Sequence, residues 1–187
     1  MKTHFTLCLV TLALLWAAAA SSEDKARVHV DRPVVPANPQ DVSSIEGIVR
    51  ASYEVISGGV GVPRQWGRDR TLGDPHMRFV SLSKDPKTGQ VTRSSGTEQD
   101  FADHADAYFV KTGFREHELA HAIHRFGNVA TVVSSYEGKE TAASKPADRG
   151  VNIFQLYNDG KRWWILSIIW DEERPDNPIP QELLPKK

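Results

Sequence analysis

The chain has 187 residues, of which 40% are hydrophobic, and a formal net charge of −1. This length and composition predict one globular domain. The near-neutral charge gives no electrostatic basis for binding nucleic acid or an anionic membrane, so we expect neither partner. The single cysteine, Cys8, lies in the first apolar segment. Thiol catalysis and cysteine-ligated metal are therefore excluded from the rest of the chain.

The N-terminal segment has the features of a secretory signal peptide. Lys2 precedes an uncharged apolar run from Phe5 to Ala20, which ends in a row of small alanine residues. We therefore expect cleavage after residue 20 and a secreted or periplasmic protein. The alternative is an uncleaved membrane anchor, but the run is shorter than the roughly 20 residues that span a bilayer.

Beyond residue 20 the chain divides into three parts. Residues 21–40 contain Pro33, Pro36 and Pro39 and predict a flexible lead-in. Residues 41–173 form the predicted domain. Residues 174–187 form a proline-rich tail.

The first half of the domain predicts three helices and a hairpin. Apolar residues at three- and four-residue spacing indicate an amphipathic helix from an Asp41 N-cap to Ile56. A short second helix is expected within residues 64–72. A hairpin turns at residues 85–89, which contain proline and glycine. The third helix, residues 98–111, is preceded by a Thr97–Asp100 capping box and followed by Gly113.

The C-terminal third predicts four long antiparallel strands, rich in β-branched residues. Their expected ranges are 114–126, 129–137, 151–157 and 163–170. The turns between the first pair and the last pair are Gly127-Asn128 and Asn158-Asp159-Gly160. Helices followed by a curved sheet of this kind indicate an α+β fold.

Several stretches of this region resemble the nuclear transport factor 2-like superfamily. They are Arg125–Ala130, Ser134–Glu137 and Gln155–Ile165, with the last strand ending at Trp170. The resemblance implies a cone, in which a curved mixed sheet wraps around three N-terminal helices and leaves a pocket at the wide end. It also implies a homodimer formed through the sheet face. The superfamily includes ketosteroid isomerase, polyketide cyclases, scytalone dehydratase and members that only bind or assemble, so it assigns no activity.

One short motif indicates metal chemistry. His117-Glu118-Leu119-Ala120-His121 matches H-E-x-x-H, in which two histidines of one helix bind zinc. On the predicted strand both histidines lie on one face but about 13 Å apart at ~3.3 Å per residue, and His124 takes the other face. A single zinc ion cannot join them. We therefore expect no metal site, and no cofactor.

Carboxylates on the same strand offer acid–base chemistry. Glu116 and Glu118 share one face of it. A carboxylate with apolar neighbours in a pocket has a raised pKa and can abstract a proton. Glu116 or Glu118 is thus a candidate base, with Arg125 or Tyr108 as electrostatic support. The alternative is an exposed strand face or a salt bridge.

Aromatic residues offer a binding surface for a flat apolar ligand. The candidate binding residues are Tyr53, Trp66, Tyr108, Gln155 and Trp170. Pairing across the Asp159-Gly160 turn is expected to set Gln155 beside Trp164, which places Gln155 and Trp170 on the face that lines the hollow. In the alternative arrangement Asn152, Ser167 and Asp171 face the hollow.

Three functions fit these features. The first is binding of a small apolar or aromatic ligand without chemistry. The second is a cofactor-independent isomerase, cyclase or dehydratase that uses a pocket carboxylate. The third is a dimeric assembly module without catalysis. A desolvated carboxylate in the pocket would favour the second function, and a pocket filled by side chains would favour the third.

Overall fold

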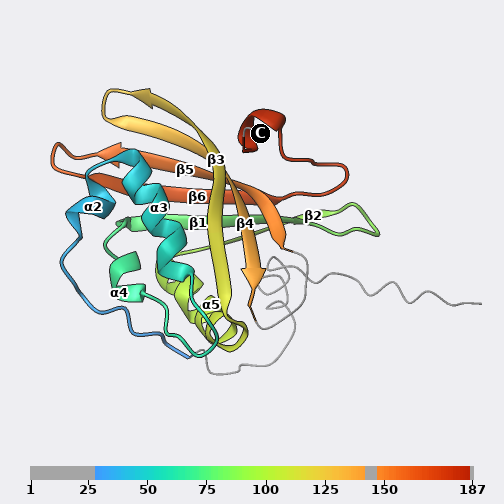
Figure 1. The fold of residues 1–187 in the computed structure, drawn as a ribbon, viewed down its shortest axis with the longest axis horizontal. Helices are drawn as coiled ribbons and strands as arrows, with labels where there is room; N and C mark the ends of the chain where they lie inside the picture. Colours follow the sequence, from blue (N-terminus) through green and yellow to red (C-terminus); the bar gives the residue numbers. More distant parts are fainter. Residues whose placement is uncertain (1–27, 142–146, 186–187) are drawn as a thin grey trace, which may run out of the picture.

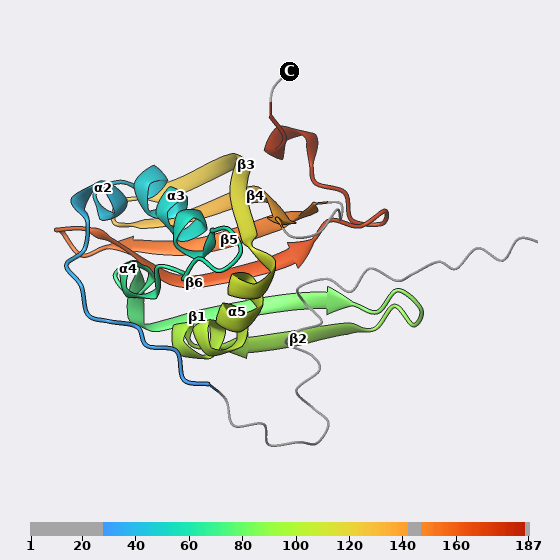
Figure 2. The ribbon, with the colours of Figure 1, turned by 60° about the horizontal axis from the view of Figure 1, so that its bottom comes forward.

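The computed structural model describes residues 28–141 and 147–185. The expected signal peptide lies outside these residues. Within them, no helix is both long and apolar enough to cross a membrane. They form an α+β fold in which one curved six-stranded sheet carries helices on its concave side (Figures 1 and 2).

The sheet has the strand order β2-β1-β6-β5-β4-β3. The strands are β1 (Gly73–Lys84), β2 (Val91–Gly96), β3 (Phe114–Phe126), β4 (Val129–Glu140), β5 (Asp148–Asn158) and β6 (Trp163–Glu172). β1 runs parallel to β6, and the other neighbours are antiparallel. The expected mixed sheet is thus confirmed, and the N-terminal hairpin is joined to the last strand of the chain.

The first predicted helix is in fact two helices. α2 (Pro39–Val42) is capped by Asn38, and α3 (Ile45–Ile56) begins anew at Ser44, whose hydroxyl accepts from the Gly47 amide at 3.0 Å. The prediction of Asp41 as the N-cap was wrong, because Ser44 adopts the extended backbone that a cap needs. Asp41 is instead buried and bonded to Arg68.

The other two helices are confirmed. α4 (Trp66–Asp69) is short. α5 (Glu98–Thr112) begins with the Thr97–Asp100 capping box and ends at Gly113, whose φ of +68° is the left-handed conformation expected after a helix. α3 and α5 both lie over the concave face of the sheet (Figure 2).

Strand β3 contains an extra residue that changes which side chains share a face. In β3, Glu118 pairs with Tyr136 but Ala120 pairs with Ser135, so Leu119 forms a bulge. His117 then pairs with Glu137 and His121 with Ser134. Residues three apart on the regular strand β4 point to opposite faces. The prediction that His117 and His121 share a face was therefore wrong.

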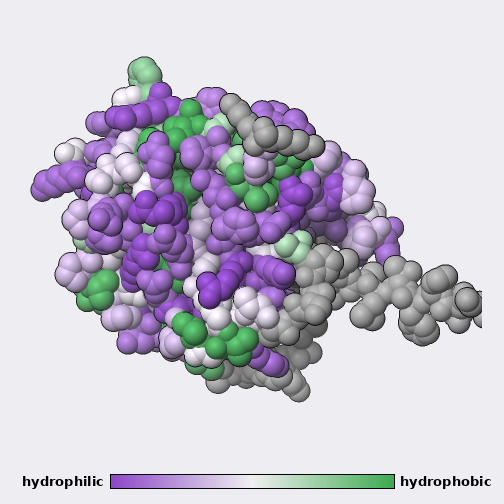
Figure 3. Space-filling view, viewed as in Figure 1, coloured by the Kyte–Doolittle hydropathy of each residue, from purple (hydrophilic) through white to green (hydrophobic). Residues whose placement is uncertain are grey.

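The core lies between the helices and the concave face of the sheet. Its most deeply buried large side chains include Ile48 of α3, Phe109 of α5, and Phe154 and Ile165 of the sheet. The surface in Figure 3 is mainly hydrophilic, with separate hydrophobic groups between polar ones. The core side chains surround a cavity between helices and sheet, and its walls are mainly apolar.

The segment before α2 is attached to the helices. The Val30 amide donates to Asp103 at 2.8 Å, and its carbonyl accepts from Gln99 at 2.9 Å. Arg32 then inserts between α4 and α5, with its side chain 8% exposed. We expected residues 21–40 to be a flexible lead-in; within its described part, residues 28–40, Val30 and Arg32 bond to side chains of α4 and α5.

The tail after β6 also packs onto the domain. Its 3-10 helix η2 (Gln181–Leu183) buries Leu183, and the Ser135 hydroxyl of β4 donates to the Leu183 carbonyl. Ser135 points away from Ser134, whose hydroxyl meets Tyr53 of α3. The tail therefore covers part of the convex face of the sheet.

Candidate functional site

A cavity of about 70 Å³ lies between α3, α5 and the concave face of the sheet. Its wall is mainly aromatic and aliphatic, with five carboxylic acids among the lining residues. The acids are Asp69, Glu98, Glu116, Asp148 and Glu172. The volume is below the roughly 300–1,000 Å³ of typical drug-sized ligand sites, so the cavity suits a small molecule.

The position of Glu116 is fixed by the end of α3. Its amide donates to the Ser57 hydroxyl at 2.9 Å, and that hydroxyl also lies 3.0 Å from its carbonyl. Across the sheet, Glu116 pairs with Gly138. A Cβ at Gly138 would lie 3.4 Å from Glu116 Oε2 and 3.0 Å from the Phe114 ring. The glycine therefore leaves room for this carboxylate between its neighbours.

Glu116 is a desolvated acid. Burial raises its pKa from 4.5 to about 8, against the opposing effect of a hydrogen bond from Asn152. The side chain retains some exposed area because it borders the cavity, yet protein atoms replace most of its water. Its Oε1 lies 3.5 Å from Asn152 Nδ2. Such a group holds a proton near neutral pH and can exchange it with a bound molecule.

A chain of hydrogen bonds leads from the cavity to the surface. Asn152 Nδ2 donates to the Tyr53 hydroxyl at 3.2 Å, which lies 2.7 Å from the Ser134 hydroxyl. Ser134 donates to Glu118 Oε1 at 2.6 Å, and Glu118 Oε2 contacts His121 Nδ1 at 2.9 Å. Since Ser134 donates to Glu118, Tyr53 donates to Ser134. Because the Tyr53 hydroxyl donates to Ser134, it does not donate to Glu116. The group that donates to Glu116 is the Asn152 side-chain amide.

A second polar group lies on the cavity wall at α4 and α5. Arg32 bonds Asp69 at 3.2 Å and Glu98 at 2.7 Å. Burial raises the pKa of both carboxyls, and Arg32 opposes the shift. Because two desolvated acids share one guanidinium, this group can also hold a proton near neutral pH.

Between these polar groups the cavity wall is aromatic. The Phe79 and Phe101 rings stack with centroids 4.6 Å apart, and Trp170 meets them edge-on at 6.2 and 6.4 Å. Phe109 and Phe114 form a second stacked pair, also at 4.6 Å. These rings come from both helices and sheet, so a ligand here would contact aromatic faces and edges.

The structure brings three of the candidate residues together. Glu116, Tyr53 and Trp170 all line the cavity. Glu118 lies nearby on the same strand face but bonds to Ser134 and His121 rather than bordering the cavity.

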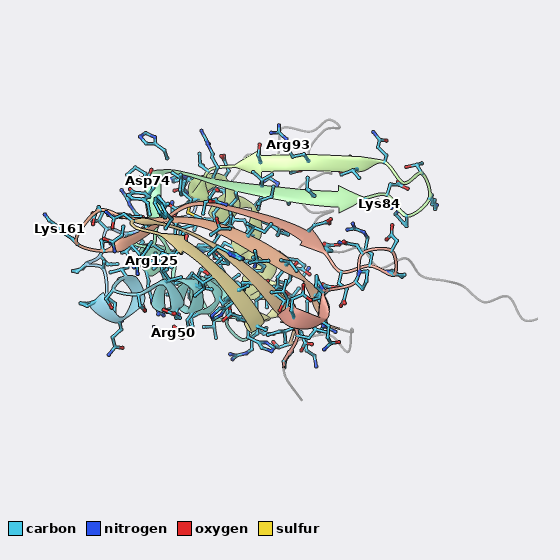
Figure 4. The ribbon with its side chains drawn as sticks, turned by 90° about the horizontal axis from the view of Figure 1, so that it is seen from above. Arg50, Asp74, Lys84, Arg93, Arg125 and Lys161 are labelled. Carbon is cyan, nitrogen blue, oxygen red and sulfur yellow. The ribbon has the colours of Figure 1, made fainter. Side chains whose placement is uncertain are left out.

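The other candidates lie elsewhere. Tyr108 bonds to Glu140, and Trp66 is buried with its indole NH on Asp106 at 2.6 Å. Arg125 stacks over Trp163 at 5.1 Å, near the far end of β3 from Glu116. Figure 4 shows Arg125 towards the end of the sheet that carries Asp74 and Lys161, and Lys84 towards the other end. At ~3.3 Å per residue, Arg125 is up to about 30 Å from Glu116.

The predicted pairing of β5 with β6 was wrong. Gln155 pairs with Ser167, not with Trp164, because the connection is longer than a two-residue turn and Leu166 forms a bulge. Gln155 is therefore exposed on the convex face, where its side chain bonds to Thr131 at 3.1 Å. Asn152 and Phe154 face the cavity instead, while the bulge keeps Trp170 on the cavity side.

The described residues contain no group of three or more His, Cys, Asp or Glu side chains that could hold a metal ion. The H-E-x-x-H segment lies on strand β3, as predicted, and its Glu118 carboxylate contacts His121 alone of the two histidines. His117 points to the opposite face.

Sequence reasoning missed several residues of the cavity. Asn152 was considered only in an alternative, and Asp69, Glu98, Phe79 and Phe101 were not singled out. No local pattern marks them, because they meet only through the pairing of β1 with β6 and the docking of α5. Gly138 lies just beyond the predicted strand 129–137 and inside the observed β4, where a glycine accompanies close approach of another group.

A second cavity, of about 250 Å³, lies on the convex side beneath residues 177–180. Its wall is formed by aliphatic residues of β1, β5 and β6 and by the tail. The three acids at its rim are already engaged: Asp171 accepts from Arg174, Glu173 accepts from the Ile179 amide, and Glu172 has an interaction of its own. It offers no group comparable to Glu116.

No protein-family model matches the sequence, and no curated protein matches it. Solved structures do match, at low sequence identity. A nuclear transport factor 2-like protein of unknown function from Shewanella baltica is 12% identical, with a TM-score of 0.42; the match covers 67% of this chain and 86% of that one. A protein of the same description from Methylobacillus flagellatus is 12% identical, with a TM-score of 0.47 and coverage of 71% and 99%.

The association domain of CaMKII from C. elegans is 13% identical, with a TM-score of 0.46 and coverage of 68% and 92%. These values concern fold and give no argument about activity. In fold, the chain resembles the nuclear transport factor 2-like proteins.

Proposed function

We propose that the chain binds a small molecule in the cavity beside Glu116 and exchanges a proton with it through that carboxyl, without a cofactor. This is chemistry of the isomerase or dehydratase type. The observation that supports it is the desolvated Glu116, whose pKa is raised to about 8. A base with a pKa near the working pH combines a useful ionised fraction with a strong drive to take a proton.

Each neighbour of Glu116 has a role in this proposal. The carboxylate removes a proton from a carbon next to a carbonyl and returns it to another position. The Asn152 amide, 3.5 Å from Oε1, orients the carboxylate and can donate to an oxygen of the ligand. The aromatic rings exclude water, which strengthens these interactions.

The proposal is tested by proton exchange into a probe ketone. Cyclopentanone in D2O should lose its α-hydrogens faster with the protein than with buffer alone, and the rate should rise with pH through about 8, where Glu116 ionises. Glu116→Gln should reduce the protein-dependent rate at least 100-fold. Glu137→Gln, which alters an acid outside the cavity wall, is the control. Equal rates in wild type and Glu116→Gln would contradict the proposal.

We also propose that the chain forms a homodimer through the convex sheet face. The exposed apolar side chains Phe126 (87%) and Val129 (55%) lie at the end of the β3–β4 hairpin, and Leu166 is 47% exposed on β6. Sedimentation equilibrium should give twice the monomer mass, and Leu166→Lys should lower the association constant at least tenfold. A wild-type monomer at 100 µM would contradict this proposal.

A further inference from the structure

The residues around Glu116 indicate what charge a ligand should carry. The described residues that line the cavity include five acids and no lysine, arginine or histidine. Arg32 lies behind the wall and is engaged by Asp69 and Glu98. Asp148 and Glu172 have interactions of their own. Glu116 is therefore the acid on which a ligand's charge would act.

The carboxylate of Glu116 is incompletely bonded. Its Oε1 has the 3.5 Å contact with Asn152, and within the described part of the chain Oε2 has no hydrogen bond or ion pair. Oε2 lies beside Gly138 at the cavity wall. A desolvated carboxylate with a single long contact is poorly compensated, and a cation or strong donor in the cavity would satisfy it.

The aromatic wall favours the same kind of ligand. Ring faces carry partial negative charge and attract cations, most strongly when the cation is desolvated. Phe79, Phe101 and Trp170 converge within 6.4 Å of one another, and the Phe109–Phe114 pair adjoins Glu116 on β3. A single small molecule can therefore contact a ring and the carboxylate together.

We propose that the ligand of this cavity is a small organic cation, such as an alkylammonium, with its charge between Glu116 Oε2 and the adjoining aromatic rings. This inference rests on the proposed use of the cavity as a binding site and adds the chemical class of the ligand. It does not depend on whether proton exchange follows binding.

Binding should depend on pH because the cation needs an ionised carboxylate. The titratable groups facing Glu116 are Tyr53, Tyr136 and Asp148. Burial raises the pKa of both tyrosines, so they stay neutral in the range of interest. Asp148 raises the pKa of Glu116. Binding should thus tighten as the pH rises from 6 to 9, with release of a proton from Glu116.

Isobutylammonium and isobutanol test the charge, because they have the same shape and differ only in the –NH₃⁺ and –OH ends. Isothermal titration at pH 8.5 should show isobutylammonium binding at least tenfold more tightly than isobutanol, and isobutyrate more weakly than either. The preference should fall below twofold in Glu116→Gln and persist in Glu137→Gln. Melting temperatures of both variants check that they are folded.

Other results overturn the inference. If wild type binds isobutanol as tightly as isobutylammonium, or binds isobutyrate most tightly, the cavity takes a ligand of another class. If none of the three binds, the ligand class is also wrong, and the cyclopentanone exchange decides separately whether the proposed function stands. A preference for isobutylammonium that is unchanged in Glu116→Gln would place the cation at another acid and contradict the assignment to Glu116.

Discussion

At the scale of single residues, Glu116 and Glu118 lie on one strand but have different surroundings and hydrogen bonds. Glu118 accepts hydrogen bonds from Ser134 and contacts His121 at the surface. Glu116 borders an apolar cavity and has one weak amide contact. Burial raises the pKa of Glu116 to about 8. The sequence places both on one face, but only the packing of α3 over β3 makes Glu116 the desolvated one.

Glu116→Gln should make stability less dependent on pH. The folded pKa of Glu116 is about 8 and its ordinary value is 4.5, so the folded state binds the proton more tightly and wild-type stability falls as pH rises between these values. The variant lacks this loss. The unfolding free energy of the variant minus that of wild type should therefore increase by on the order of 3–5 kcal/mol from pH 4 to pH 9.

Urea unfolding of both proteins at several pH values measures this difference. Subtracting the two curves cancels the contributions of Asp69 and Glu98, whose pKa values burial also raises. A difference that stays constant from pH 4 to pH 9 would mean that Glu116 ionises normally in the folded protein.

Arg32→Met should destabilise the protein through the acids that it leaves behind. The Arg32 side chain is 8% exposed and bonds two buried carboxyls, and breaking such a group costs roughly 3–5 kcal/mol. When the pH is below the raised pKa values of Asp69 and Glu98, both acids take up protons. The loss of unfolding free energy caused by Arg32→Met then becomes smaller. We therefore expect a larger deficit in unfolding free energy at pH 8 than at pH 5.

The matched control is Arg93→Met on β2, which is exposed (Figure 4). It should change stability by less than about 0.5 kcal/mol at both pH values. Similar effects of the two substitutions would show that Arg32 is not needed to compensate Asp69 and Glu98.

At the scale of elements, the helix and strand positions could be predicted well because they depend on local signals. Alternating and helical periodicity, the Thr97–Asp100 box and the Gly127 and Gly160 turns all mark boundaries that the structure confirms. The bulges at Leu119 and Leu166 carry no such signal. Each bulge reverses the faces on which the following side chains lie. The bulge at Leu166, together with the longer β5–β6 connection, is why Gln155 lies on the convex face and not in the hollow.

Gly113→Ala should be costly because of what surrounds the end of α5. The residue has φ +68°, and an added Cβ would lie 2.6 Å from the Val60 amide nitrogen and would also clash with the Thr141 hydroxyl. Gly127→Ala is the control, since its φ is +56° but nothing lies within 4 Å of the added atom.

Thermal unfolding should show a loss of about 1 kcal/mol for Gly127→Ala, from the left-handed conformation alone. The loss for Gly113→Ala should be at least twice as large. Equal losses would mean that the contact between the 58–61 turn and the α5 terminus adjusts without strain.

At the scale of the whole molecule, segments distant in sequence complete the domain at both ends. The N-terminal segment places Arg32 behind the cavity wall, and the tail places Leu183 on the convex face. Neither could be predicted, because proline-rich segments carry no periodicity that indicates where they dock. The cavity itself also depends on this scale, since helices, hairpin and last strand each supply part of its wall.

Leu183→Ala tests whether the tail is part of the folded domain. Leu183 is 5% exposed, so its truncation should lower the unfolding free energy by about 2 kcal/mol or more. Val91→Ala truncates an aliphatic side chain of β2 that is 59% exposed and should have less than half the effect. Denaturant unfolding of both variants measures the difference, and equal small effects would mean that the tail is not held on the sheet.

The central claim is that Glu116, at the cavity wall and apart from the Arg32 group, keeps its proton near neutral pH. A ¹³C NMR titration of the glutamate side-chain carboxyls measures this directly, with Glu116→Gln used to assign the resonance. We expect the Glu116 resonance to titrate near pH 8, because burial raises its pKa to about that value. Titration near the ordinary value of 4.5 would contradict both the desolvated site and the proton exchange proposed for it.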